Sequence, residues 1–323
     1  MENISTVYHT GGLGDFITAF PAIIEWNKRN KSCRKILLGK PSYGILGVHA
    51  GLFDEIWDVE SAAFSWLYNL NSPAHPSIKD MLSGIQSALL FTSGDSPVLA
   101  RFRQLEVKKL LFQDPFPQMR IHIADYHLSL FNKDSKPPLK STAKLFPHPD
   151  FKNEADKKLN GIGRFITLHP GSGSERKNWP ADEFFALADK LREKGFRMVW
   201  IAGPAETEMS FPSTDAVVQN AALPLLVHIL SNGSLYIGND SGISHLAAAC
   251  GGRCVVLFGP SDAGVWRPVG ENIVIVKARN GDCFPCHPSR DKITPKVCKR
   301  SCMSDISVEE VFDSCKKVLA PLQ

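Results

Sequence analysis

A group of polar residues follows the apolar segment 235–237 and carries the strongest chemical signal of the sequence. Asp240, Ser241 and His245 stand where a turn gives way to a helix of small residues that begins at Gly242. Because the first backbone N–H groups of a helix lack acceptors within it and its dipole is positive there, an anion is favoured. The sequence therefore predicts that Ser241 and Gly242 hold a diphosphate and that Asp240 binds sugar hydroxyls. His245 fits a structural hydrogen bond better than a catalytic role.

A second polar loop runs from His169 to Pro180 and follows another apolar segment. Gly171 and Ser172 offer backbone and hydroxyl donors, and Lys177 adds positive charge. These groups suit a phosphate or pyrophosphate, although the loop lacks the Gly-x4-Gly-Lys pattern of a P-loop. The alternative is a solvated loop before a helix whose first turn contains Pro180.

Two carboxylates stand in similar positions after predicted strands. Glu206 follows a Gly-Pro pair, where an acid either accepts hydrogen bonds from ribose hydroxyls or lies at the surface. Asp15 follows Gly12 and Gly14, which let the backbone pass close to a ligand. The spacing of these glycines departs from the dinucleotide-binding fingerprint at its last position. Asp15 is interpreted either as a functional acid at the mouth of a cleft or as a helix N-cap.

Four of the eight cysteines have the spacing of a metal site. Cys283, Cys286, Cys298 and Cys302 form a pattern that fits a structural zinc held by four thiolates. The segment is rich in proline and lacks a clear knuckle, so free thiols, or disulfides formed on oxidation, are the alternative interpretation. The other four cysteines are expected to be packing residues.

The overall composition is that of a globular protein. Hydrophobic residues make up 43% and charged residues 22% of the 323 positions, and the net charge of +4 is too small to predict a nucleic-acid partner. Residues 277–300 hold seven Lys or Arg and two Asp. This segment is expected either to face an acidic ligand or an anionic membrane, or to be a solvated loop.

The sequence gives no sign of a membrane span or a secretory leader. Its apolar runs are too short to cross a bilayer, and its first residues lack basic and apolar leader regions. We therefore expect a cytoplasmic protein with mostly reduced cysteines. Any membrane contact is expected to be peripheral, at the cytoplasmic face of the inner membrane.

Short apolar strands alternate with amphipathic helices in both halves of the chain. This alternation predicts an α/β protein with two Rossmann-like, doubly wound parallel sheets, and ligands in the cleft between them, beyond the carboxyl ends of the strands. The predictions for the first half include a helix at 98–111 and a strand at 120–123. The expected organisation is an N-terminal domain at 1–145, a linker at 146–160, a C-terminal domain at 161–305 and a final helix at 306–323 that packs back on the first domain.

With these motifs in order, the chain resembles glycosyltransferase family 9, the heptosyltransferase family. The resemblance implies the GT-B fold, in which the active site lies between two Rossmann-like halves. It also implies transfer of a sugar, usually heptose from ADP-heptose, to the lipopolysaccharide core, with inversion of the anomeric centre. The resemblance covers nearly the whole chain and is strongest in Gly12-Leu13-Gly14-Asp15, His169-Pro170-Gly171, Lys177-Asn178-Trp179-Pro180, the run from Asp240 to Ala248, and Phe258-Gly259-Pro260-Ser261-Asp262.

The resemblance further implies roles for single residues. Asp15 resembles the general base, Lys177 the lysine that binds the diphosphate, and Glu206 the acid that binds ribose. Asp240 resembles the residue that holds the donor sugar. His9 stands where many members have arginine, so its contact is expected to differ. The other donor-binding positions are Gly12, Gly14, His169, Gly171, Ser172, Ala222 and Leu223 (beside adenine), Ser241, Gly242 and His245.

Inverting transfer needs a base for the acceptor hydroxyl and stabilisation of the leaving diphosphate. No Asp-x-Asp pair occurs in the sequence, so the favoured scheme uses Lys177 and the helix at Gly242 in place of a metal, and it requires no cofactor. The expected partners are a nucleotide-sugar donor and a lipid-linked or lipopolysaccharide core glycan acceptor. The alternatives are a GT-B nucleotide-sugar epimerase and a nucleotide-sugar-binding protein without catalysis.

Overall fold

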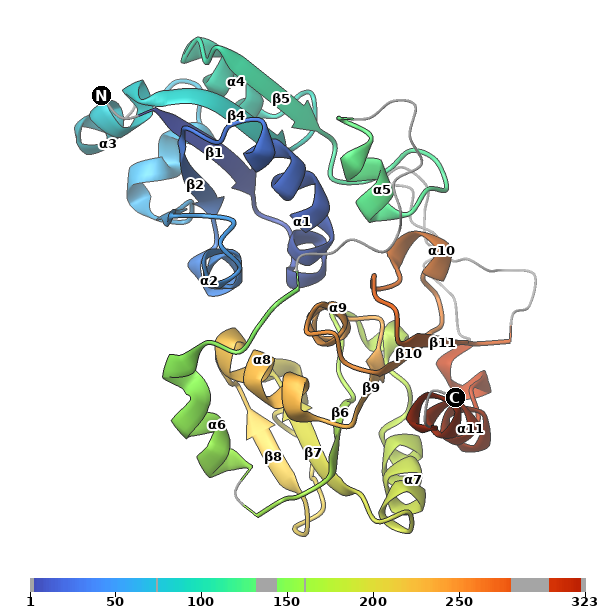
Figure 1. Cartoon of the computed structure of the whole chain (residues 1–323). Coiled ribbons are helices and arrows are strands. Elements are labelled where there is room, and N and C mark those ends of the chain that lie inside the picture. Colours follow the sequence, from blue (N-terminus) through green and yellow to red (C-terminus); the bar gives the residue numbers. More distant parts are fainter. Residues whose placement is uncertain (1–2, 74, 132–143, 160, 280–301, 321–323) are drawn as a thin grey trace. The chain divides into compact units, whose positions relative to one another are not determined.

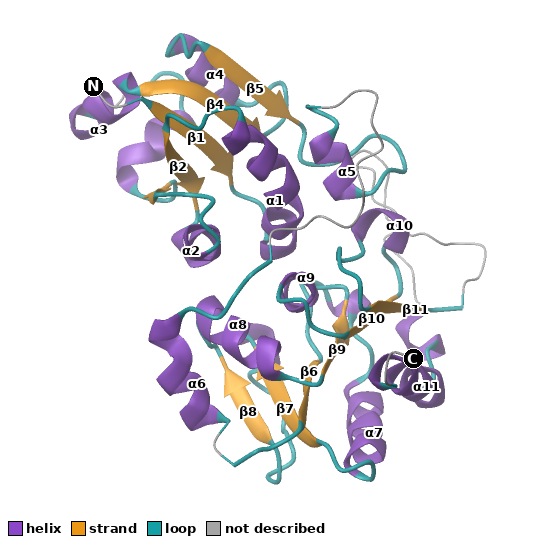
Figure 2. Cartoon of the chain, in the orientation of Figure 1, coloured by secondary structure: helices purple, strands orange, loops and turns teal. Residues whose placement is uncertain are grey.

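The computed structural model describes residues 3–73, 75–131, 144–159, 161–279 and 302–320. They form two compact α/β units (Figure 1). The first unit contains the residues up to Met119 and the segment that begins at Ile123, and the second contains Arg120–His122 and the described residues from 144 onward. In both units strands alternate with helices along the chain (Figure 2). The predicted architecture of two parallel α/β units is therefore confirmed.

The first unit is built on a five-stranded sheet in the order β3-β2-β1-β4-β5, in which all neighbouring strands are parallel. One face packs against buried side chains of η1, α3 and α4. On the other face lies α1, where Trp26 Nε1 donates to Ser5 Oγ at 2.9 Å. The elements are β1 (Ile4–His9), α1 (Leu13–Lys28), β2 (Arg34–Gly39), α2 (Pro41–His49), β3 (Glu55–Asp58), η1 (Ala62–Leu67), α3 (Pro76–Ser83), β4 (Ile85–Phe91), α4 (Pro97–Gln104), β5 (Lys109–Gln113) and α5 (Ile123–Leu128).

The second unit is built on a six-stranded parallel sheet in the order β11-β10-β9-β6-β7-β8. Helices α7 and α11 pack together on one face, and α6, α8 and α9 form a second group (Figure 1). The elements are η2 (Pro149–Phe151), α6 (Lys152–Lys158), β6 (Phe165–His169), η3 (Glu175–Lys177), α7 (Ala181–Arg192), β7 (Arg197–Ala202), η4 (Pro204–Glu206), β8 (Ala216–Gln219), α8 (Leu223–Asn232), β9 (Leu235–Asn239), α9 (Gly242–Ala249), β10 (Cys254–Phe258), α10 (Ala263–Trp266), β11 (Ile273–Lys277), η5 (Cys302–Asp305) and α11 (Val308–Leu319).

The predicted helix at 98–111 is wrong in its second half. Helix α4 ends at Gln104, and the chain then forms the edge strand β5. Glu106 has a φ of 51°, in the left-handed region that ends a right-handed helix. Leu110 and Leu111 belong to an apolar run that is too short for its periodicity to separate a strand from a helix.

The predicted strand at 120–123 is also wrong. Arg120 donates from Nε and Nη2 to the carboxylate of Asp262, at 2.5 and 3.2 Å, and His122 Nε2 lies 2.9 Å from the carbonyl oxygen of Arg267. Ile123 already belongs to α5. These partners are 142 and 145 positions away in sequence, so local hydrophobic patterning could not report them.

Two parts of the expected domain organisation differ from the structure. The stretch 146–160, expected as a linker, contains α6, which packs on α8 and whose Ala155 is 1% exposed. The final helix α11, expected to pack on the first domain, packs against α7 and strands of the second unit. Val311 and Cys315 carry its apolar stripe into the second unit's core, where both are fully buried.

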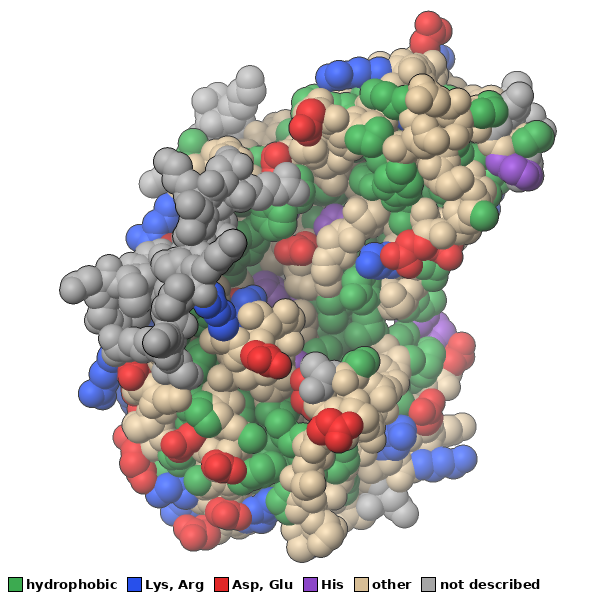
Figure 3. Space-filling model, turned by 180° about the vertical axis from the view of Figure 1, so that it is seen from behind, with side chains coloured by type: hydrophobic (Ala, Val, Ile, Leu, Met, Phe, Trp, Pro, Cys, Tyr) green, Lys and Arg blue, Asp and Glu red, His purple; other side chains and the backbone are tan. Residues whose placement is uncertain are grey.

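The surface carries charges of both signs. On the face shown in Figure 3, acidic and basic side chains are interspersed over the second unit. This mixture agrees with the small net charge of +4. Across the part of the chain that the structure describes, no helix combines the length and apolarity needed to cross a bilayer.

Leu187 of α7 provides a test of the core that α7 and α11 share, because it is fully buried there. We expect Leu187→Ala to lower the free energy of unfolding by about 2–5 kcal/mol, since the substitution leaves a cavity. Urea denaturation followed by tryptophan fluorescence measures this change. Ala186→Lys on the exposed side of the same helix is the matched control, with an expected change within about 0.5 kcal/mol. Equal unfolding curves for Leu187→Ala and the parent would contradict this packing.

Candidate functional site

The candidate site lies at the carboxyl ends of β6 and β9, in the middle of the second sheet. From β6 the chain continues to β7 and β8 on one side, whereas β9 is followed by β10 and β11 on the other side. At such a reversal the loops that leave the two strands diverge, and ligands bind in the crevice between them. His169, the last residue of β6, is paired with Gly238 of β9, so the two loops start side by side.

The loop after β9 leads into α9 through a capped helix start. Ser241 is the N-cap, and its side chain accepts a hydrogen bond from the backbone N–H of Ser244. Ser244 Oγ donates to the carbonyl oxygen of Asn239 and lies 2.9 Å from Tyr236 Oη. The first helical residue, Gly242, belongs to the turn whose N–H groups point out of the helix. The predicted anion site at the start of α9 therefore has a fixed backbone.

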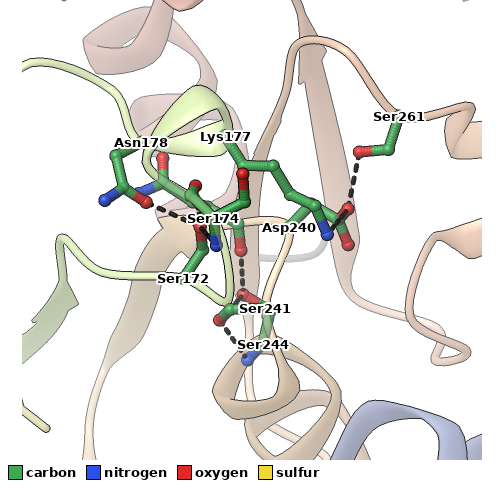
Figure 4. A network of polar contacts seen from close by, with 9 residues as sticks. Ser172, Ser174, Lys177, Asn178, Asp240, Ser241, Ser244 and Ser261 are labelled. Carbon is green, nitrogen blue, oxygen red and sulfur yellow. Dashed lines mark hydrogen bonds and ion pairs between the residues drawn. The ribbon is translucent and has the colours of Figure 1, made fainter. Parts of the chain in front are cut away.

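Beside this helix start, Asp240 forms an ion pair with Lys177. Lys177 Nζ lies 2.9 Å from Asp240 Oδ2, and the Asp240 side chain is only 7% exposed whereas that of Lys177 is 33% exposed. Ser261 Oγ donates to the same oxygen (Figure 4). The structure thus brings together two residues predicted from separate motifs, and it supplies the buried carboxylate with a cation and a neutral donor.

The loop that carries Lys177 is tied to β9 by the side chain of Asn239, which is fully buried. Its Nδ2 donates to the carbonyl oxygen of Pro170 at 2.6 Å, and its Oδ1 accepts from the backbone N–H of Trp179 at 3.1 Å. Inside the loop, Ser172 Oγ lies 2.7 Å from the Ser174 carbonyl oxygen. Sequence reasoning missed the role of Asn239, although a polar residue at the end of a buried strand was a signal.

Glu206 lies in η4, just after β7, and is 6% exposed. Its Oε2 accepts from the backbone N–H of Gly203 at 2.6 Å. Its Oε1 lies so close to Gly171 that a Cβ at position 171 would be 1.7 Å away. The carboxylate therefore leans over the loop that follows the neighbouring strand β6, and only glycine at 171 permits this approach.

Two buried imidazoles line the same edge of the sheet. Burial lowers the pKa of His169 to about 4. Burial is also the main cause that lowers the pKa of His245 to about 4, although the nearby Asp240 acts in the opposite direction. Both rings are neutral at physiological pH, and His169 Nδ1 lies 3.3 Å from Ser241 Oγ. The positive charge at this site therefore comes from Lys177 and the helix start.

The sites on β6, β7, β8 and β9 form a row along one edge of the sheet. Ala222 is the N-cap of α8 after β8, and Leu223 is the first residue of that helix. From β8 to β9 the row spans three strand spacings, about 14 Å. It offers apolar side chains after β8, the acid Glu206 after β7, and Lys177 with the start of α9 after β6 and β9. Such a row suits an elongated ligand with a ring, hydroxyls and an anion in that order.

In the first unit, Asp15 occupies the third position of α1 and not the N-cap, which is Gly12. Asp15 Oδ2 accepts from the backbone N–H of Gly12 at 2.9 Å, and Gly14 lies between them in the first turn. These residues follow β1, which together with β4 forms the reversal point of the first sheet. Asp15 therefore lies at the carboxyl edge of the first sheet, and it also holds the start of α1.

His9, at the end of β1, is a packed residue. Its ring lies 5.3 Å from that of Phe16 and 5.4 Å from that of Phe91, measured between centroids. Burial lowers the pKa of His9 to about 4, so the ring is neutral. This chain therefore has no cation at the position where the resemblance leads one to expect arginine.

The predicted zinc site mostly falls outside the described residues. Cys283, Cys286 and Cys298 are not among them, and Cys302 lies in η5, where it is partly buried. Among the residues that the structure describes, no group of three or more His, Cys, Asp or Glu side chains is arranged to hold a metal ion. The zinc interpretation stays a prediction.

Comparison with known proteins identifies the family of this chain. The model of a family described as "Glycosyltransferase family 9 (heptosyltransferase)" matches residues 80–296. The chain is 24% identical to lipopolysaccharide heptosyltransferase 3 of Escherichia coli K12, over 86% of this chain and 83% of that protein.

Solved structures share the fold. A glycosyltransferase family 9 structure from Veillonella parvula has a TM-score of 0.81 at 17% identity and covers 99% of this chain and 98% of its own. The E. coli heptosyltransferase WaaC with ADP has a TM-score of 0.66 at 16% identity, with 97% and 99% covered. The expected GT-B class is thereby confirmed.

The buried His169 generates a prediction about pH. Its pKa is about 4 in the folded chain and is ordinarily 6.5, so the unfolded chain takes up the proton first. The stability that the neutral ring contributes is complete above pH 6.5 and is lost as the pH falls toward 4. As the pH falls from 6.5 to 5, we expect the free energy of unfolding of His169→Gln to decrease less steeply than that of the parent. The two slopes should differ by about 1 kcal/mol per pH unit. Urea denaturation at several pH values tests this, with His75→Gln at an exposed position as control, and parallel slopes for His169→Gln and the parent would refute it.

Proposed function

The chain belongs to glycosyltransferase family 9, the heptosyltransferase family, and on this premise we propose that it transfers heptose from ADP-heptose to a lipopolysaccharide core or a related lipid-linked glycan. The names of its relatives support a heptosyltransferase over an epimerase. The ADP bound by the similar E. coli enzyme supports an adenine nucleotide as the donor. The observation that carries the proposal is the pairing of Lys177 with Asp240 beside the start of α9.

We assign donor binding to the row of sites on the second unit. The adenine is proposed to lie beside Ala222 and Leu223, and the ribose hydroxyls to donate to Glu206. The diphosphate is proposed to accept from Lys177, from Ser241 and from the backbone of Gly242. This order follows the order of the strands. It also places the negative diphosphate beside the positive charge of Lys177 and the positive end of the α9 dipole.

The proposed reaction is a single displacement. The acceptor hydroxyl oxygen forms a bond to the anomeric carbon while the bond from that carbon to the β-phosphate oxygen breaks. ADP leaves with the electron pair, the acceptor proton passes to Asp15, and attack opposite the leaving group inverts the anomeric centre. Lys177 and α9 stabilise the charge that develops on the diphosphate, so the scheme requires no metal.

The nature of the acceptor determines where in the cell the proposed reaction takes place. A lipid-linked glycan is confined to a membrane, so we propose peripheral contact with the cytoplasmic face of the inner membrane. Lys277 and Arg279 are the described members of the basic segment that sequence analysis connected with an acidic ligand or an anionic membrane. Their charge favours contact with anionic lipids.

Lys177→Ala tests the donor site. Loss of the contact to the diphosphate is expected to weaken ADP binding by about 1.5–3 kcal/mol, the range for hydrogen bonds to charged groups. Isothermal titration calorimetry with ADP measures this, and titrations with UDP, GDP and CDP show whether adenine is preferred. Lys194→Ala, an exposed lysine of the same unit, is the control. Unchanged ADP affinity in Lys177→Ala would remove the lysine from the site.

Asp15→Asn tests the proposed base. The amide oxygen can still accept from the Gly12 N–H, so α1 keeps its start, but the amide does not take up the acceptor proton. We expect transfer to fall about 10²–10⁴-fold with ADP affinity retained. Asp54→Asn is a matched control, because Asp54 Oδ2 also accepts a backbone N–H, from Lys35 at 2.7 Å. Transfer by Asp15→Asn at the parent rate would overturn the assignment.

A further inference from the structure

The loop from Gly259 to Asp262 follows β10, the strand next to β9, and it has no role in the function proposed so far. Its first residue is held by close packing. A Cβ at position 259 would lie 2.3 Å from Met303 Sδ, and Met303 is fully buried. Because the backbone at Gly259 rests directly on the side chain of Met303 in η5, the beginning of the loop has a fixed position.

The end of the loop is held by a buried carboxylate. Asp262 is 2% exposed, and its Oδ1 accepts from the backbone N–H of Gly264 at 2.8 Å, which caps α10. Arg120 donates to the same carboxylate through two of its nitrogens. Bidentate pairing of this kind fixes direction as well as distance. The loop is therefore anchored at both ends, and Ser261 stands between the anchors.

Ser261 uses this fixed position to contact Asp240. Its hydroxyl donates to Asp240 Oδ2 at 2.5 Å, and Lys177 Nζ lies 2.9 Å from the same oxygen (Figure 4). Both partners thus engage one oxygen of a carboxylate that is only 7% exposed. Neither Lys177 nor Ser261 engages the second oxygen, Oδ1, in these contacts.

We infer that Ser261 is a positioning residue that orients Asp240 toward the donor sugar, an inference that rests on the proposed function. When a nucleotide-sugar binds, Lys177 shifts part of its bonding to the diphosphate and Asp240 loses part of its cationic partner. The hydroxyl of Ser261 keeps Oδ2 occupied and prevents rotation of the carboxylate. Oδ1 then accepts from a hydroxyl of the sugar, and the anomeric carbon is held in line with the leaving diphosphate.

A purely structural role of Ser261 would have a different consequence. If the hydroxyl only stabilised the loop, its loss would weaken binding of ADP and of the nucleotide-sugar alike, or would only lower the melting temperature. A positioning role concerns the sugar alone. It predicts that the preference for the nucleotide-sugar over ADP changes while ADP affinity stays constant.

The experiment compares Ser261→Ala with Ser261→Thr, which restores a hydroxyl. Ser314→Ala is the control, because Ser314 is a buried serine of the same unit that donates within α11. Calorimetry gives the affinities for ADP and for ADP-heptose, and steady-state kinetics gives kcat and KM. For Ser261→Ala we expect about a tenfold loss in affinity for ADP-heptose or in kcat, from one hydrogen bond to a charged group, and ADP affinity within about twofold of the parent. Ser261→Thr should recover most of the loss.

A double-mutant comparison sharpens the test. Once Asp240→Asn has removed the charged acceptor, adding Ser261→Ala should cause little further loss, because the two residues act through one contact. If the parent transfers heptose and Ser261→Ala matches it in every measurement, or if both affinities fall equally, the positioning role is wrong and the proposed function stands. If the parent neither binds ADP nor transfers heptose, the proposed function is wrong and the inference falls with it.

Discussion

A carboxylate that is almost completely withdrawn from water constrains the whole edge of the second unit. The Asp240 side chain is 7% exposed, and a buried charge is strongly destabilising unless nearby groups compensate it. Lys177 supplies the opposite charge and Ser261 a neutral donor, and they come from the loops after β6 and β10. Both loops must therefore be ordered, which Asn239 achieves for the first and Asp262 for the second.

The order of the strands makes this compensation possible. Because β9 lies between β6 and β10, the loops on either side of Asp240 start from neighbouring strands of a parallel sheet and leave at the same edge. The side chain of Glu206 extends the same edge toward β7, where it leans over Gly171. A parallel sheet with a central reversal thus collects charge and hydrogen-bonding groups from segments far apart in sequence, as residues 171 and 240 illustrate.

Sequence alone predicted the position of the polar residues that follow buried strands. The alternation of strands predicted that Asp240, Ser241, Lys177 and Glu206 lie at one edge of the sheet, and the structure places them there, whereas their roles in donor binding stay predictions. The role of Ser261 could not be found in this way, since its partner is 21 positions away and the contact depends on the pairing of β9 with β10. The edge strand β5 and the packing of α11 were missed for a related reason, because short apolar runs and amphipathic stripes do not reveal which neighbour covers them.

The Lys177–Asp240 pair makes recognition of nucleotide and of sugar interdependent in the proposed reaction. A diphosphate that binds alone draws Lys177 from a carboxylate with little access to water, so part of the electrostatic gain is offset by the loss to Asp240. Hydrogen bonds from sugar hydroxyls to Asp240 replace the interaction that Asp240 loses with Lys177. The complete nucleotide-sugar therefore provides partners for both Lys177 and Asp240, whereas the nucleotide or the sugar alone leaves one of these two residues with fewer partners. A single ion pair with a buried carboxylate can in this way favour the intact donor over the product nucleotide and so assist release of the nucleotide after transfer.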